Sequence, residues 1–250
     1  MQPPRPVGVF VGGLAQDMIS FIHIRDTRNT GDMASCPASY MDFGTDQIEV
    51  LNYTDQVRHD SEIQIYGGGT MVNWLNSHRP SEITPKVIWG AGSSRHGQTE
   101  PWPDPEGFAL IGTREWTPER EKAGLYAPCP SCMSPLFDRD YEVTRERVTF
   151  VNASESIRAR YPAIYNLPLP TIDNSWPVEA IIEFLAKAET VVTNSWHGLY
   201  WARLLGRNVE VHGYSSKFHR LAPHTLEEAR DITRRFYERV MALVGERVAA

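Results

Sequence analysis

The residues best placed to do chemistry surround His197. An apolar run over 189–193 predicts a buried strand, and a periodic apolar stretch over 195–205 predicts a helix that ends before Gly206. His197 then falls in the first turn of that helix, where free backbone N–H groups and the helix dipole favour an anion. A histidine there can bond phosphate or transfer a proton. A purely structural histidine after a strand is the alternative.

Glycine-rich turns follow other predicted strands. The strand predicted over 62–66 ends at three glycines, Gly67, Gly68 and Gly69, and the strand predicted over 87–89 also ends in glycines. Glycine lets a ligand approach the backbone closely. Open α/β sheets bind ligands at the carboxyl ends of their strands, which is where these runs fall. A tight turn without a ligand is the other explanation.

The elements that must position these residues alternate along the chain. Short apolar runs, each followed by a helical stretch, indicate parallel sheets with crossover connections. The predicted strands cover residues 19–24, 47–52, 62–66, 87–89, 108–111, 148–151, 189–193 and 209–211, and the longer helices 177–188, 195–205 and 225–244. Residues 116–147 are rich in proline, cysteine and charge. We therefore expect an N-terminal lobe over 1–115, a connecting segment over 116–147, and a C-terminal lobe with the final helix over 148–250.

Composition narrows the function classes. The chain has 250 residues and a formal net charge of -6, which argues against a nucleic-acid partner because such binding usually needs a basic face. No apolar stretch is long enough to span a membrane and no secretory signal is evident, so we expect a cytoplasmic protein. Cys129 and Cys132 have metal-ligand spacing, but no second pair completes a four-ligand zinc site. The sequence therefore predicts no metal.

The segment around His197 resembles the C-terminal motif of the polysaccharide pyruvyl transferase family. That motif is a strand, Ser-x-x-His-Gly, a helix, a Gly, and a strand that leads to a Lys. The matching elements here are Asn194-Ser-Trp-His-Gly198, Ala202, Gly206 and Lys217. Further family-like elements occur in the family's order: Asn29-Thr-Gly-Asp32, Ile65-Tyr-Gly-Gly-Gly69, Val87-Ile-Trp-Gly-Ala-Gly92 and Ile111-Gly-Thr-Arg-Glu115. The resemblance covers about residues 19–220.

The resemblance implies a fold and an activity. The fold is α/β, with two Rossmann-like lobes facing a cleft, similar to B-type glycosyltransferases. The activity is that of a transferase in exopolysaccharide biosynthesis, which moves the enolpyruvyl group of phosphoenolpyruvate onto saccharide hydroxyls and forms a pyruvate ketal. The implied partners are this small donor and a saccharide acceptor, with no cofactor. A lipid-linked acceptor would bring the protein to the inner face of the membrane.

The resemblance also implies site residues. The implied catalytic residues are His197 as the proton donor, Arg114 as the clamp on a carboxylate or phosphate, and Asp32 as the base, with Glu115 as the other candidate base. The implied substrate-binding residues are Asn29, Gly67, Gly68, Gly69, Arg95, Ser195 and Lys217. Ser195 stands where many members of the family carry an Arg.

Alternatives remain open at this stage. Arg114 can simply pair with Asp32 or Glu115, and Lys217 can belong to a solvated helix end. At the level of function, the same cleft would suit a glycosyltransferase that uses a nucleotide sugar. A non-catalytic saccharide-binding protein of the same fold is the third possibility.

Overall fold

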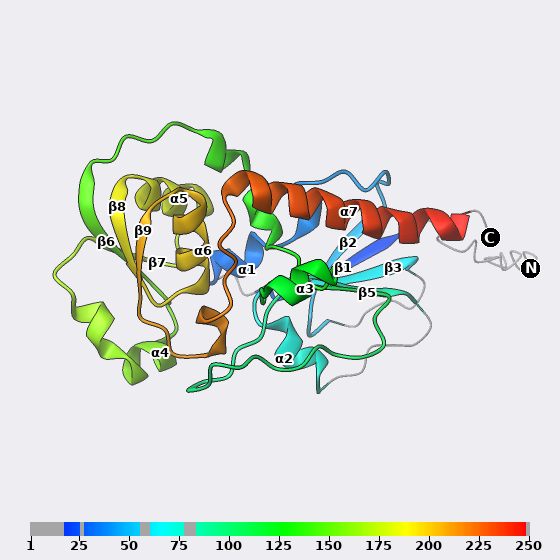
Figure 1. The fold of residues 1–250 in the computed structure, drawn as a ribbon, viewed down its shortest axis with the longest axis horizontal. Coiled ribbons are helices and arrows are strands. Elements are labelled where there is room, and N and C mark those ends of the chain that lie inside the picture. The colour runs from blue at the N-terminus through cyan, green and yellow to red at the C-terminus, as the bar shows by residue number, and fades with distance from the viewer. Residues whose placement is uncertain (1–17, 26–27, 56–60, 78–83, 249–250) are drawn as a thin grey trace, which may run out of the picture.

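The protein is a mixed α/β structure with two parallel sheets (Figure 1). It was analysed as a computed structural model, which describes residues 18–25, 28–55, 61–77 and 84–248. The first 17 residues of the predicted N-terminal lobe lie outside the described residues. The α/β class with parallel strands, predicted from the alternation of apolar runs and helical stretches, is confirmed.

The first sheet is built from the N-terminal part of the chain. Its strands are β1 (Ile19–His23), β2 (Ile48–Asn52), β3 (Ile63–Gly67), β4 (Lys86–Ala91) and β5 (Leu110–Thr113), in the order β2-β1-β3-β4-β5. Between them lie α1 (Thr30–Met33), η1 (Pro37–Ser39) and α2 (Met71–Leu75). Every residue of β1, β3 and β4 is buried, which explains why these strands appear in the sequence as mostly apolar runs without a regular polar alternation.

The second sheet follows the same plan with one strand fewer. Its strands are β6 (Arg145–Val151), β7 (Thr171–Asp173), β8 (Ala188–Thr193) and β9 (Asn208–Val211), in the order β7-β6-β8-β9. The helices of this half are α4 (Glu155–Arg160), η4 (Pro162–Asn166), α5 (Val178–Ala186), α6 (Trp196–Leu204) and η5 (Ser216–Phe218).

The strand order of both sheets creates a place for a ligand. In the first sheet the chain moves from β1 outward to β2, and then to the other side of β1 with β3. In the second sheet β7 and β8 flank β6 in the same way. Such a reversal leaves a crevice at the carboxyl ends of the two central strands, because the connections on either side depart in opposite directions. Each sheet therefore has one such switch point.

The segment that joins the two sheets is largely buried over residues 126–137 and exposed over most of residues 138–147. It carries α3 (Pro118–Lys122), η2 (Pro130–Met133) and η3 (Pro135–Asp138), and Tyr126 forms a parallel bridge with Thr113 at the end of β5. Its cysteines Cys129 and Cys132 are fully buried. The proline-rich composition thus corresponds to short 3-10 turns packed between the sheets.

The final helix, α7 (Leu226–Val248), spans both halves (Figure 1). It begins with reciprocal hydrogen bonds between Thr225 and Glu228, a capping box. Near its start Ala229 belongs to the core of the second sheet, whereas Phe236 and Val240 pack into the core of the first. The helix predicted over 225–244 therefore lies partly over the first sheet.

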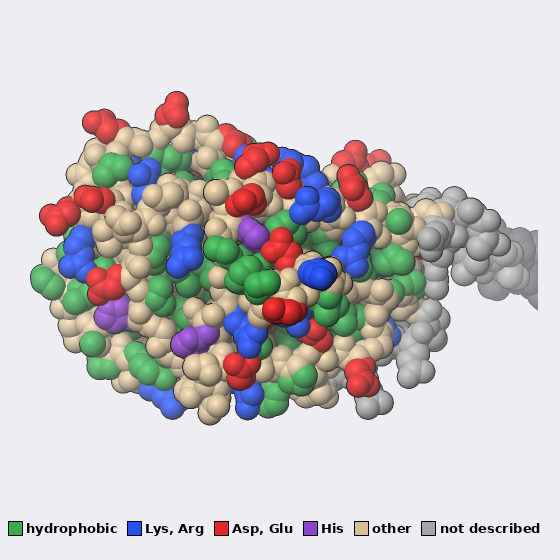
Figure 2. Space-filling view, viewed as in Figure 1, with side chains coloured by type: hydrophobic (Ala, Val, Ile, Leu, Met, Phe, Trp, Pro, Cys, Tyr) green, Lys and Arg blue, Asp and Glu red, His purple; other side chains and the backbone are tan. Residues whose placement is uncertain are grey.

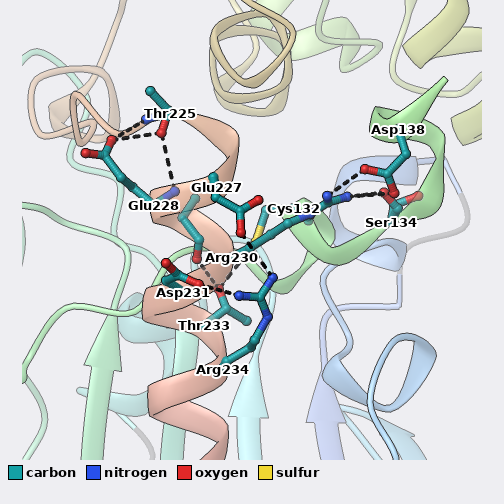
Figure 3. Close-up of polar contacts among 11 residues, drawn as sticks. Cys132, Ser134, Asp138, Thr225, Glu227, Glu228, Arg230, Asp231, Thr233 and Arg234 are labelled. Atoms are coloured by element: carbon teal, nitrogen blue, oxygen red, sulfur yellow. Dashed lines mark hydrogen bonds and ion pairs between the residues drawn. The ribbon is translucent and has the colours of Figure 1, made fainter. Parts of the chain in front are cut away.

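Arg230 fastens this helix to the connecting segment (Figure 3). Its guanidinium donates two hydrogen bonds to the carboxylate of Asp138, at 2.6 and 3.1 Å, and further bonds to the carbonyl oxygens of Cys132 and Ser134. A bidentate pair of this kind fixes orientation as well as distance. The contact holds α7 and the turns η2 and η3 in one arrangement.

The predicted strands all occur, with ends shifted by a few residues, but β7, α3, α4 and the 3-10 turns after β5 were not predicted. β7 has only three residues, and α4 buries no side chain, so neither leaves a pattern in the sequence. Among the described residues, no helix has the length and apolar content to cross a membrane. Acidic and basic side chains are interspersed on the face shown in Figure 2.

Candidate functional site

A cavity of about 660 Å³ lies where the carboxyl ends of the two sheets meet. The residues after every strand except β2 contribute to it. Its lining from the first half is Arg28, Asn29, Asp32, Gly69, Thr70, Asn73, Ser94, His96 and Arg114; from the second half it is residues 152–157, Asn174, Ser195, Trp196, His197, Tyr214 and Lys217. The switch points of both sheets thus open into one shared cavity, the expected ligand position for this topology.

His197 lies in the first turn of α6, as predicted, and its side chain is buried. Its ring packs against Trp196 and Trp201, with centroid distances of 5.0 and 5.1 Å. Its Nε2 lies 3.3 Å from the hydroxyl of Ser35 and 3.7 Å from the thiol of Cys129. Burial holds the pKa of His197 well below its usual value, and the charges of Arg114 and Lys217 lower it further. The imidazole is therefore neutral at pH 7 when no anion is bound.

Arg114 follows β5 and is 4% exposed, yet its guanidinium is poorly partnered. Its Nε and Nη1 atoms are buried and make no hydrogen bond within the described part of the chain. The group lies flat over the ring of Trp196, 3.7 Å from the centroid. A Cβ atom at Gly92 would come within 2.2 Å of Nε, so this glycine makes room for the side chain. Such a planar donor suits a carboxylate or phosphate.

Lys217 and Asp32 complete the charged end of the cavity. The ammonium of Lys217 donates a 2.7 Å hydrogen bond to the hydroxyl of Tyr214 and lies over its ring. The pKa of Lys217 is lowered to about 7, mainly by burial and also by the charge of Arg114, whereas Asp32 opposes the shift. Asp32 is buried and accepts a 2.7 Å hydrogen bond from the side-chain amide of Asn29. Arg114, Lys217 and His197 therefore line the same cavity as the carboxylate of Asp32.

The loop that carries Asn29 and Asp32 is held by the opposite half of the molecule. The amide of Asn174 donates to the side-chain oxygen of Asn29 at 2.9 Å, and Thr30 donates from its backbone N–H to the carbonyl of Asn174 at 2.8 Å. The hydroxyl of Thr30 donates to the carbonyl of Trp176. These bonds join the loop after β1 to the loop after β7 and set the position of Asp32 relative to the second sheet.

The structure places most of the sequence-predicted site residues together. His197, Arg114, Asp32, Asn29, Gly69, Ser195 and Lys217 all line the cavity. Gly67 and Gly68 lie deeper, where a Cβ at either position would crowd the buried ring of His23. Arg95 is not among the lining residues, because its guanidinium is directed to the ring of Trp102, 4.8 Å from the centroid. A pairing of Arg114 with Asp32 or Glu115 was the alternative to a binding role. Neither carboxylate accepts a hydrogen bond from Nε or Nη1, which have no hydrogen-bond partner among the described residues.

Several lining residues were missed from the sequence. Residues 152–157 and Asn174 follow β6 and β7, and Asn73 and Ser94 follow β3 and β4. The sequence contained a signal for the first group, since polar residues directly follow the predicted strand over 148–151. Ser35 and Cys129 were missed for another reason: they lie beneath His197, far from it in sequence, and only the tertiary packing brings them there.

Within the described residues, no group of three or more His, Cys, Asp or Glu side chains is arranged to hold a metal ion. The fold and the site define a mixed α/β protein with a polar cavity between two parallel sheets, lined by Arg114, Lys217 and His197. Comparisons with protein-family models, with curated proteins and with solved structures gave no match.

Proposed function

We propose that the protein is a transferase that moves the enolpyruvyl group of phosphoenolpyruvate onto saccharide hydroxyls to form a pyruvate ketal. The observation that carries the proposal is the buried guanidinium of Arg114, with two nitrogens lacking partners among the described residues, in the same cavity as Lys217 and His197. Glu115 and Asp32 are close enough to attract this charge, but buried N–H groups without acceptors are still costly, so their retention favours a ligand that supplies the missing acceptors. We also propose that the two halves form two lobes about this cavity, in an arrangement similar to that of B-type glycosyltransferases.

Phosphoenolpyruvate matches this end of the cavity because it carries a planar carboxylate and a phosphate on one small skeleton. In the proposed pose Arg114 binds the carboxylate with its fork, and Lys217 binds the phosphate. Amide and hydroxyl side chains line the remainder, including Asn73, Ser94 and Asn152. Such groups hydrogen-bond sugar hydroxyls without requiring charge, so we assign this part to the acceptor, whether free or lipid-linked at the inner membrane face.

The proposed reaction needs one relayed proton. Neutral His197 accepts the proton of an acceptor hydroxyl as its oxygen bonds to the central carbon of the enol, and returns that proton to the terminal carbon, which becomes a methyl group. A second hydroxyl then displaces phosphate from the same carbon, and its proton leaves with the phosphate. Asp32 is placed to assist the second deprotonation. The products are the cyclic ketal and inorganic phosphate, which balances atoms and charge.

A stacked group of aromatic rings favours a second candidate, a glycosyltransferase with a nucleotide-sugar donor. The ring of Tyr214 lies between those of His96 and Tyr161, with centroid distances of 5.2 and 5.1 Å. His96 is exposed and lines the cavity, so its outer face is available to a nucleobase. The two candidates share the acceptor and differ in the donor.

The donor is tested by ligand-induced stabilisation and product release. We expect phosphoenolpyruvate to raise the melting temperature in proportion to its occupancy, and uridine diphosphate to leave it unchanged. With a panel of free, nucleotide-linked and lipid-linked saccharides, the wild type should release inorganic phosphate from phosphoenolpyruvate, and His197→Ala should reduce that release by at least about 100-fold. Stabilisation by uridine diphosphate alone would support the glycosyltransferase instead, and phosphate release undiminished in His197→Ala would remove His197 from the chemistry.

Donor affinity should depend on pH through Lys217. The free protein has a Lys217 pKa of about 7, and a bound phosphate raises it. Affinity is therefore constant somewhat below pH 7 and weakens by up to about tenfold per pH unit above it, because binding must then take up a proton. Titration calorimetry from about pH 6.5 to 8.5, in buffers of different ionisation enthalpy, measures both effects. In Lys217→Arg, whose guanidinium stays charged, the dependence should disappear; its persistence there would assign the pH effect to another group.

A further inference from the structure

We propose that Ser35 is a positioning residue that fixes the tautomer of His197, so that Nε2 carries the ring proton and Nδ1 is the atom that accepts a proton from substrate. Ser35 follows α1 of the first half and is fully buried, whereas His197 begins α6 of the second half. The inference uses the proposed function only for the identity of the proton that Nδ1 accepts.

The hydrogen bonds of Ser35 allow one assignment. Its hydroxyl lies 2.7 Å from the carbonyl oxygen of Gly31, which can only accept, so the single hydroxyl hydrogen is donated there. Towards Nε2 of His197, 3.3 Å away, the same oxygen can then only accept. Nε2 must carry a hydrogen to make that bond. In a neutral imidazole the other nitrogen, Nδ1, then has the lone pair.

The surrounding network is consistent with this assignment. The thiol of Cys129 lies 3.2 Å from the Ser35 oxygen and can donate to its second lone pair. Cys129 in turn lies 3.2 Å from the hydroxyl of Ser131, which accepts from the indole N–H of Trp201 at 3.0 Å and so can donate to the sulfur. In this series of hydrogen bonds, from the indole of Trp201 to the carbonyl of Gly31, each hydrogen thus has one acceptor. The other neutral tautomer would leave two acceptors, Nε2 and the Ser35 oxygen, facing each other.

On the other side of the ring, the imidazole occupies the place that a side chain at position 31 would take. Nδ1 of His197 lies beside Gly31, where a Cβ atom would come within 2.1 Å of it, and within the described chain Nδ1 has no hydrogen-bond partner. Burial and the neighbouring cations hold the pKa of His197 low, so the ring is neutral before substrate binds. Nδ1 is therefore the free basic nitrogen of the site, and Ser35 holds it in that state.

The tautomer can be observed without any substrate. In long-range proton–nitrogen spectra of protein labelled with 15N-histidine, with His197 assigned by its loss in His197→Gln, we expect a protonated Nε2 and an unprotonated Nδ1 at pH 7. In Ser35→Ala the populations should move towards the other tautomer, and kcat should fall by roughly 10- to 100-fold, with a small change in the KM of the donor, as for other groups that orient a histidine.

Two matched variants separate positioning from packing. Ser131→Ala removes a buried hydroxyl from the same network without touching the imidazole, and Cys129→Ala removes the more distant neighbour of Nε2; both should keep the wild-type tautomer. An unprotonated Nε2 in the wild type, or the same tautomer in Ser35→Ala as in the wild type, would overturn the proposal. The wild-type spectrum alone tests the assignment, so the result does not depend on folding of Ser35→Ala. It is also independent of whether phosphoenolpyruvate is the donor.

Discussion

Replacing Arg114 with methionine should weaken donor binding by at least about 100-fold and leave the protein at least as stable as the wild type. The loss of two charge-assisted hydrogen bonds costs at least about 3 kcal/mol, or about 100-fold in the donor Kd. Stability should not fall, because the substitution removes two buried N–H groups that lack acceptors among the described residues, which offsets the lost attraction to Glu115 and Asp32, while an apolar chain still packs on Trp196. Urea denaturation and donor titration of the same samples measure the two effects.

The opposite behaviour of stability and binding is what distinguishes a ligand-binding arginine from a structural one. If Arg114 were a structural residue that the surroundings satisfy, its removal should destabilise the fold by about 3–5 kcal/mol, the usual effect of breaking a buried pair. Arg203→Gln is the matched control: Arg203 lies on α6, like His197, but is exposed and outside the cavity. It should change neither donor affinity nor the free energy of unfolding by more than about 0.5 kcal/mol.

Gly31→Ala should impair turnover more than binding. The added Cβ would lie 2.1 Å from Nδ1 of His197, so the imidazole or the loop after β1 must move. Displacement of a catalytic group by about 1 Å lowers kcat roughly 100-fold, whereas Arg114 and Lys217 keep the donor site. Forcing an atom into this packing should also cost about 1–3 kcal/mol of stability. Steady-state kinetics and urea denaturation test both statements.

A double-mutant cycle shows whether the collision with His197 is the cause. In Gly31→Ala combined with His197→Ala the obstructing ring is absent, so the destabilisation by the new methyl group should largely disappear. Gly245→Ala serves as the control, because a Cβ there meets nothing within 4 Å and should leave turnover unchanged. If the effects of the two substitutions on stability are additive, contact between the new methyl group and the imidazole is not the cause of the destabilisation.

Much of the fold could be predicted from the sequence because strands buried in a parallel sheet appear as short, mostly apolar runs. β1, β3 and β4 are buried throughout and mostly apolar, and polar or glycine residues follow each of them. The short, half-exposed β7 has no such apolar run, and α4 has no buried face that would produce a helical pattern. The position of the final helix along the chain was predicted correctly. Which sheet it covers was not, because apolar residues such as Phe236 and Val240 could pack against either sheet; they pack against the first.

The site was predictable in part for a related reason. His197, Arg114, Asp32 and Lys217 each follow a strand, and the carboxyl ends of parallel strands gather ligand-binding groups. Arg95 also follows a strand, yet its side chain turns to Trp102, which only the local packing decides. Cys129 was judged from its spacing to Cys132, and its actual neighbours, Ser35 and His197, come from distant segments. Contacts of this kind depend on the tertiary fold and not on a local pattern.

The central claim is that Arg114 provides the anchor for an anionic three-carbon donor beside His197. Calorimetric titration of phosphoenolpyruvate into the wild type and Arg114→Met at about pH 6.5 tests it most directly. The account predicts saturable binding with one site per chain in the wild type and binding at least about 100-fold weaker in Arg114→Met. Equal affinity in the two proteins, or binding of uridine diphosphate where phosphoenolpyruvate shows none, would contradict it.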